Sequence, residues 1–123
     1  MSKHKTKTIY IEGKEIKIDI ECINLVKLFN QVGLKTKHSC QGDAQNDFSI
    51  IFDDSITDND MITFISKFKN KYGHSPFIGK FSKWVRLMNN KLSYNWMYTA
   101  KDYNAAHITY VRIKSILEGT YND

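Results

Sequence analysis

The spacing of apolar residues along this chain changes repeatedly between a period of two, typical of strands, and the longer period of a helix. Strand-like spacing covers residues 8–12, 15–20, 34–40, 48–52, 84–88 and 92–99. Helical spacing covers residues 21–32 and 59–72, and it returns after Asp102 as far as Leu117. Two strand segments therefore precede each helix. This order predicts an α+β fold with a mixed or antiparallel sheet built from hairpins, about six strands, and three helices mainly on one face.

The residues between these segments are typical of turns and helix ends. Gly33 and Gly119 follow helical patterns, as C-caps do, and Asp58 precedes one, as an N-cap does. Thr99, with Asp102 three residues later, is typical of the capping arrangement at the start of a helix. Residues 89–91, Asn-Asn-Lys, tolerate the positive φ of a hairpin turn. Residues 74–82 match neither period, so we expect a loop there.

Length and composition indicate one folded domain over residues 1–123, with frayed ends at 1–7 and 120–123. The chain is 41% hydrophobic and 25% charged, with a single proline, as in ordinary globular proteins. No apolar run approaches the roughly 20 residues of a membrane-spanning helix, so no membrane partner is expected. We expect a cytoplasmic protein, in the host cytoplasm if its origin is viral.

The two cysteines, Cys22 and Cys40, fit a reducing compartment and provide no disulfide framework. Cys22 lies on the apolar stripe of a predicted helix and is expected in the core. The net charge of +5 makes RNA a candidate partner, because basic side chains neutralise phosphates. Only Arg86 and Arg112 are arginines, however, and the remaining basic residues are lysines that an AT-rich genome could also explain.

Polar side chains gather where the strand over residues 34–40 ends. We expect ligand-binding residues here at Thr36, His38, Ser39, Cys40, Gln41 and Gly42. They combine hydroxyl, amide and thiol groups with a glycine that lets a ligand approach the main chain closely. Strict alternation places His38 and Cys40 on the same face as Leu34, which we expect to point into the core.

The last predicted hairpin supplies a second set of candidate ligand-binding residues: Trp84, Arg86, Tyr94, Trp96 and Tyr98. The rings can stack on a planar base, and the Arg86 guanidinium can pair with a phosphate. The alternative is that at least half of these rings belong to the core. We predict that this hairpin and residues 39–42 face one shared pocket.

A metal site or a catalytic site is less well supported by the sequence. His38 and Cys40 are two apart, but no second pair of ligands accompanies them, so no metal and no cofactor is expected. Cys40 would need His74 or His107 as a base, and nothing in the sequence brings either close. We therefore predict a non-enzymatic protein without catalytic residues.

The run Gly33-x-x-Thr36-x-x-Ser39-Cys40-x-Gly42, followed by a strand ending in Phe52-Asp53-Asp54, resembles small uncharacterised α+β proteins of bacteriophages. Its Ser-Cys-x-Gly part is also similar to the wybutosine-synthesis methyltransferases, which carry a basic residue where this chain has Asp43. By analogy of size and pocket chemistry, the protein looks like the anti-defence sponges of phages.

That resemblance implies a phage-encoded binding module that sequesters a nucleotide-derived immune signalling molecule. Two alternatives stay open: an RNA-binding or RNA-modifying protein, and an inhibitor that binds a host protein. The sequence also leaves open whether the chain forms a homo-oligomer.

Overall fold

The computed structural model describes residues 5–72 and 76–119, and the side chains of residues 69–72 are not part of that description. Its strands are β1 (Thr6–Ile11), β2 (Lys14–Asp19), β3 (Thr36–Cys40), β4 (Phe48–Phe52), β5 (Lys80–Met88) and β6 (Lys91–Ala100). Its helices are α1 (Ile23–Gln31), preceded by a 3-10 turn at Ile20–Cys22, α2 (Asp58–Tyr72) and α3 (Tyr103–Glu118). Of the ends expected to fray, 1–7 and 120–123, residues 1–4 and 120–123 lie outside the described residues, as does His74.

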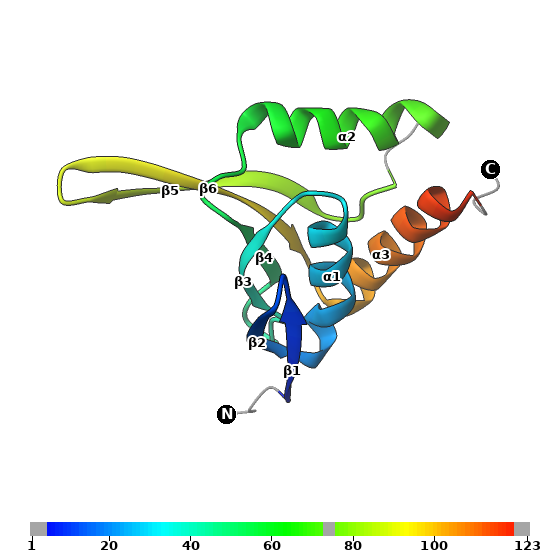
Figure 1. Cartoon of the computed structure of the whole chain (residues 1–123), viewed down its shortest axis with the longest axis horizontal. Coiled ribbons are helices and arrows are strands. Elements are labelled where there is room, and N and C mark those ends of the chain that lie inside the picture. Colours follow the sequence, from blue (N-terminus) through cyan, green and yellow to red (C-terminus); the bar gives the residue numbers. More distant parts are fainter. Residues whose placement is uncertain (1–4, 73–75, 120–123) are drawn as a thin grey trace.

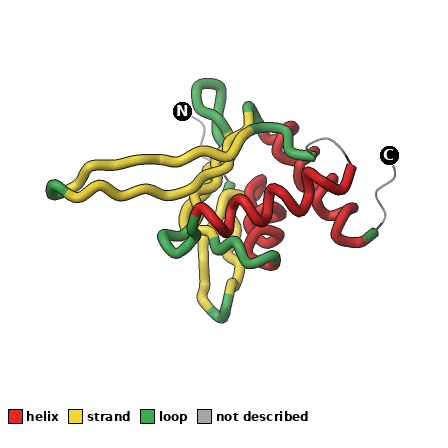
Figure 2. The backbone as a smooth tube through the Cα atoms, turned by 90° about the horizontal axis from the view of Figure 1, so that it is seen from above, coloured by secondary structure: helices red, strands yellow, loops and turns green. Residues whose placement is uncertain are grey.

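The described strands form two antiparallel sheets, which confirms the predicted α+β class. β1 and β2 make a hairpin of their own, and the larger sheet has the order β3-β4-β6-β5. The helices lie together on one side of the large sheet, as Figures 1 and 2 show. Among the described residues, no helix is long and apolar enough to cross a membrane.

Aromatic rings hold the helices against this sheet. Phe29 of α1 lies edge-on to Phe52, with ring centroids 5.1 Å apart, and its centroid is 6.0 Å from that of Tyr98. Phe64 of α2 lies 6.2 Å from Phe81 in the same way. These edge contacts suit the ring quadrupoles and add to the free energy of burying large apolar surfaces.

Several predicted boundaries are wrong because tertiary contacts extend the strands. Thr6 and Lys7 were expected to fray, but they pair with β2. Residues 80–82, expected in a loop, belong to β5, where Phe81 pairs with Tyr98 and packs against the core. The Asn89-Asn90 turn has positive φ at both residues, as predicted.

The start of α2 differs from the prediction in its capping residue. The Asp60 backbone N–H donates to Thr57 Oγ1 at 3.1 Å, and the Thr57 N–H donates to the Asp60 carboxylate at 2.8 Å. This reciprocal arrangement makes Thr57 the capping side chain. Asp58 is the first helical residue, and its carboxylate is free to bond with the sheet instead. At α3 the expected capping arrangement of Thr99 with Asp102 is wrong, because Thr99 belongs to β6. Asp102 is itself the N-cap and accepts a hydrogen bond from the Ala105 N–H.

Strand β3 contains an irregularity that changes which side chains share a face. Thr36 pairs with Phe52, but His38 pairs with Ile51, so one residue is skipped between them. Thr36 therefore stays on the helix side of the sheet, whereas His38 and Cys40 turn to the other side. The prediction that His38 and Cys40 follow Leu34 into the core is wrong, because such a bulge reverses the alternation.

Candidate functional site

The polar loop after β3 is closed by its own hydrogen bonds. The Asp43 N–H donates to the Asn46 carbonyl at 3.0 Å, and the Asn46 N–H donates to Asp43 Oδ1 at 2.9 Å. The Gln41 N–H donates to Asp19 Oδ2 at 3.0 Å, which ties the loop to the end of β2. The main chain beside Gly42 is approached by residues 46–48 of the same chain. The space beside Gly42 is therefore filled by the turn itself and not left open for a ligand.

Three of the predicted residues, Thr36, His38 and Ser39, line a pocket of about 240 Å³ between β2 and β3. Lys17 and Lys37 add positive charge to it. The remaining wall is apolar and consists of Ile16, Ile18 and Val26. Cys40 does not line this pocket, and Gln41 and Gly42 line a separate shallow one beside Asp102 and Tyr103.

Two polar side chains of this pocket, Thr36 and Lys37, already bond to neighbouring side chains. Thr36 Oγ1 accepts from Asn30 Nδ2 at 2.9 Å, which orients the hydroxyl. Lys37 Nζ lies 3.0 Å from Asp54 Oδ1. Lys17 is exposed, and so is His38. The pocket thus offers two cationic or proton-donating side chains, Lys17 and His38, to an incoming anion.

Cys22 lies behind this pocket and is fully buried, as predicted for a core residue. Burial raises the pKa of the Cys22 thiol to about 12, and a hydrogen bond with Ser39 opposes this only in part. A thiol with so high a pKa stays protonated at neutral pH and is a poor nucleophile. The cysteine therefore contributes packing rather than chemistry here.

The second predicted set is divided between the two faces of the β5–β6 hairpin. On the helix side, Asp58 accepts hydrogen bonds from Lys83 Nζ at 2.9 Å and from Trp96 Nε1 at 2.8 Å. The Tyr94 hydroxyl lies at 3.4 Å from the same carboxylate. The bonds from Lys83 and then Trp96 lower the pKa of Asp58, and the bond to Asp58 raises the pKa of Lys83. This cluster fastens the start of α2 to the hairpin.

Tyr98 belongs to the core, as the alternative interpretation of these rings allowed. Its side chain has no exposed surface, and its hydroxyl bonds with the Ile78 carbonyl and with Thr109 Oγ1. Burial raises the pKa of the Tyr98 phenol. The rings of Phe29, Phe48 and Phe81 pack around that of Tyr98, so a ligand could reach it only by displacing them.

On the face without helices, Arg86 and Trp84 surround a buried amide that the sequence analysis missed. Asn95 is 1% exposed, and its Nδ2 donates to the Phe52 carbonyl at 3.0 Å and to Asp54 Oδ1 at 2.6 Å. Its Oδ1 accepts from Arg86 Nη2, and the guanidinium carbon lies 4.5 Å from the centre of the Trp84 ring. The sequence did contain a signal for this residue: Asn is unfavourable inside strands, so an asparagine among strand-forming aromatics indicates a specific role.

The loop after β3 and Arg86, which were predicted to face one pocket, lie far apart. Cys40 pairs with Ser49, and Ser49 pairs with Thr99 of β6, whereas Arg86 pairs with Ser93. Along β6, Thr99 and Ser93 are six residues apart, which corresponds to about 20 Å. The shared pocket predicted from the sequence therefore does not form in the described part of the chain.

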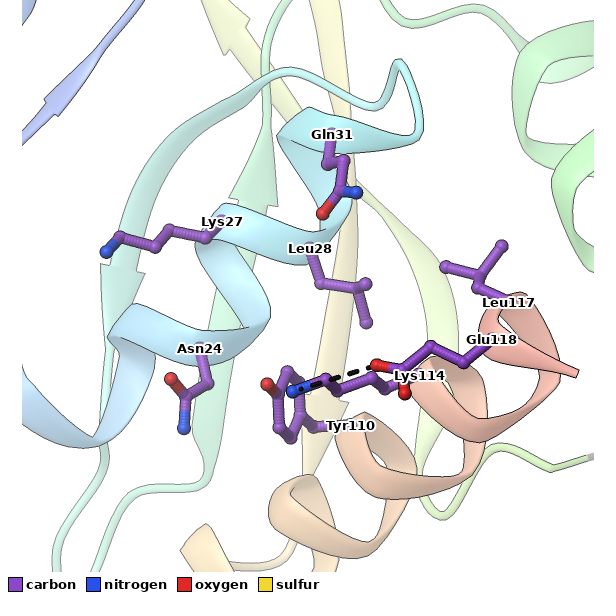
Figure 3. Close-up of a pocket in the computed structure, with 8 residues that line it drawn as sticks. All are labelled: Asn24, Lys27, Leu28, Gln31, Tyr110, Lys114, Leu117 and Glu118. Atoms are coloured by element: carbon purple, nitrogen blue, oxygen red, sulfur yellow. Dashed lines mark ion pairs between the residues drawn. The ribbon is translucent and has the colours of Figure 1, made fainter. Parts of the chain in front are cut away.

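A further pocket of about 300 Å³ lies between α1 and α3 and contains no predicted site residue (Figure 3). Its ionic groups include Lys114, which lies 3.9 Å from Glu118 and 5.7 Å from the centre of the Tyr110 ring. Lys114 therefore already has an anionic partner, and Lys27 adds an exposed cation to the same groove.

No group of three His, Cys, Asp or Glu side chains is arranged for a metal ion within residues 5–72 and 76–119. His107, one of the two candidate bases for Cys40, lies on α3 between Tyr103 and Tyr110. The other, His74, is outside the described residues.

The architecture defines a small α+β protein whose helices cover one face of an antiparallel sheet. A family model described as YoqC prophage protein matches residues 7–122, so the chain belongs to the YoqC prophage protein family. This membership supports the phage origin expected from the sequence. No curated protein matches the chain, and no solved structure does.

Proposed function

We propose that this protein is a non-enzymatic binding module that sequesters a nucleotide-derived immune signalling molecule in the pocket between β2 and β3. The observation that carries the proposal is the lining of that pocket. The lining combines Lys17, Lys37 and His38 with two hydroxyl and three apolar side chains. Cations and hydroxyls bind phosphate oxygens through charge-assisted hydrogen bonds, and apolar side chains pack against a base or ribose.

The size of the pocket limits what it can hold. At about 240 Å³ it is smaller than typical sites for drug-sized ligands, which measure roughly 300–1,000 Å³. One nucleotide unit fits such a volume better than a complete cyclic dinucleotide does. We infer that the remainder of a larger ligand would lie outside, over the exposed lysines.

The test is calorimetry with a panel of mononucleotides, cyclic dinucleotides and ADP-ribose derivatives. We expect one of these to bind wild-type protein and to be recovered unchanged after denaturation, because sequestration needs no chemical step. Lys17→Ala and His38→Ala should each weaken binding about ten- to a hundredfold, since a charge-assisted hydrogen bond contributes roughly 1.5–3 kcal/mol. Both side chains are exposed, so the melting temperature should change little.

Lys14→Ala is the matched control, because Lys14 lies on the same strand and is exposed without lining the pocket. Equal losses for Lys14→Ala and Lys17→Ala would contradict the proposed location. If the whole panel fails to bind, the proposal itself is wrong. A host protein that co-purifies with the chain would then favour the inhibitor alternative.

A second prediction concerns Cys40, the thiol within the Ser-Cys-x-Gly motif. Cys40→Ser should change ligand affinity by less than about threefold, equivalent to roughly 0.6 kcal/mol. The reason is that Cys40 pairs with Ser49 on the face opposite the core and does not line the pocket. Calorimetry of the variant measures this. Complete loss of binding with an unchanged melting curve would mean that the thiol takes part in function.

A further inference from the structure

Strands β5 and β6 continue well past the end of β4. β4 pairs with β6 only as far as Ile51 opposite Met97, whereas β5 and β6 pair with each other up to Met88 opposite Lys91. Residues 84–95, here called the arm, therefore form a two-stranded ribbon that projects from the body (Figures 1 and 2). Such a ribbon is barely stable without support. The hydrogen bonds around Asn95 and Asp58 hold its base.

The outer part of the arm exposes large apolar side chains. Leu87 and Leu92, which pair across the two strands, are 71% and 74% exposed. Val85 and Met88 are also exposed, at 55% and 59%. The register places Val85, Leu87 and Leu92 on one face and Met88 on the other. A ribbon that is apolar on both faces fits a partner that surrounds it better than one that covers a single side.

All charged side chains of the two strands are basic. Lys80, Lys83, Arg86 and Lys91 occur between Lys80 and Ala100, and no acidic residue does. At the base, Asp58 binds Lys83 and Asp54 lies next to Asn95. Lys91 lies at the tip, away from both carboxylates. This distribution disfavours a second copy of the same arm, because two such ribbons would repel each other, and it favours a polyanion.

Two aromatic rings of the arm carry cations beside them. Lys83 Nζ lies 4.4 Å from the centre of the Tyr94 ring, and the Arg86 guanidinium carbon lies 4.5 Å from that of Trp84. Both rings are about two-fifths exposed. The charge of Lys83 is paired with Asp58, whereas Arg86 bonds to the neutral amide of Asn95. Trp84 therefore presents an apolar surface directly next to a positive charge, as suits a sugar–phosphate backbone.

We propose that the arm inserts into a groove of double-stranded DNA. The major groove of B-form DNA, about 12 Å wide, admits a two-stranded β-ribbon. The deep, narrow major groove of A-form RNA does not admit side chains in this way. In the groove, Arg86 and Lys91 of the arm contact phosphates, as does Lys80 at the body end of β5, and the side chains of Leu87 and Leu92 pack against the base edges. This surface is separate from the β2–β3 pocket, so the inference stands or falls independently of the proposed ligand.

The experiment is fluorescence anisotropy with a 20-base-pair DNA duplex at several salt concentrations. Three to four phosphate contacts imply that affinity falls roughly 40- to 150-fold between 50 and 200 mM salt. The double variant Lys80→Ala/Lys91→Ala should reduce the slope of log affinity against log salt by about two. The double variant Leu87→Ser/Leu92→Ser should bind roughly tenfold more weakly with an unchanged slope, because it removes only the apolar tip.

The matched control is Lys27→Ala/Lys101→Ala, which removes the same charge from two exposed positions outside β5 and β6. Thermal melting of each variant checks the fold, and all replaced side chains are exposed. An equal loss in the control variant would overturn the proposal, since general charge would then explain binding. Equal affinity for single-stranded DNA or duplex RNA would overturn groove insertion. A wild-type dimer that Leu87→Ser/Leu92→Ser dissociates, without any DNA affinity, would also overturn it.

Discussion

Replacement of Asn95 by alanine is expected to lower the free energy of unfolding by about 2–5 kcal/mol. The side chain is buried, donates to the Phe52 carbonyl and to Asp54, and accepts from Arg86. Alanine leaves the buried Phe52 carbonyl without this hydrogen bond and removes the acceptor of Arg86. The Asp54 side chain is 69% exposed and can bond with water instead. Each unsatisfied buried group costs roughly 1–3 kcal/mol, and the vacated volume adds to the loss.

Urea unfolding followed by circular dichroism measures this effect. Asn24→Ala is the control, because Asn24 is an exposed residue of α1, and its replacement should change stability by no more than about 0.5 kcal/mol. The arm should lose the most stability, so its amide hydrogens should exchange faster with solvent in the Asn95 variant than in wild-type protein. If Asn95→Ala were as stable as Asn24→Ala, the hydrogen-bond network would not hold the arm.

Gly42→Ala is the second change for which we expect a large loss, about 2–4 kcal/mol. Gly42 has φ +78°, which costs energy for any residue with a side chain. An added Cβ would also lie 2.6 Å from the Asn46 carbonyl oxygen and 2.8 Å from the Phe48 nitrogen. Both are main-chain atoms of the same turn, so the turn must open. The pairing of β3 with β4 should weaken with it.

Gly33→Ala provides the matched comparison. Gly33 has φ +90°, but an added Cβ would meet no atom within 4 Å. It should therefore show only the backbone strain, about 1–2 kcal/mol. The difference between the two variants in thermal or urea unfolding measures the steric part. Equal losses would show that the turn after β3 adapts to a side chain.

The hydrogen bonds of Asp54 link the pocket and the arm. Bonds from Asn95 and then from Lys37 lower the pKa of the Asp54 carboxyl. Lys37 lines the β2–β3 pocket, and Asn95 supports the arm. A ligand that draws Lys37 away from Asp54 therefore changes the environment of the arm's base. A nucleotide titration in the presence of DNA would measure any coupling between the two.

Local sequence pattern was sufficient for the class of fold. The change between strand and helix periods marked three helices and six strands, because each buries one face against a common core. The Asn89-Asn90 turn behaves as predicted, since its conformation depends on immediate neighbours. Boundaries were less predictable: Thr6 and Phe81 join strands because of partners distant in the chain.

The candidate site depended on strand register and strand order, which no local sequence pattern contains. One skipped residue between Thr36 and His38 reverses the faces of β3, and strict alternation cannot reveal it. The order β3-β4-β6-β5 and the strand register separate Cys40 from Arg86 along the sheet, although both stretches carry suitable side chains. The sequence by itself determined the elements and their apolar faces. Only the tertiary structure decided which polar side chains meet, because that follows from register and strand order over long separations.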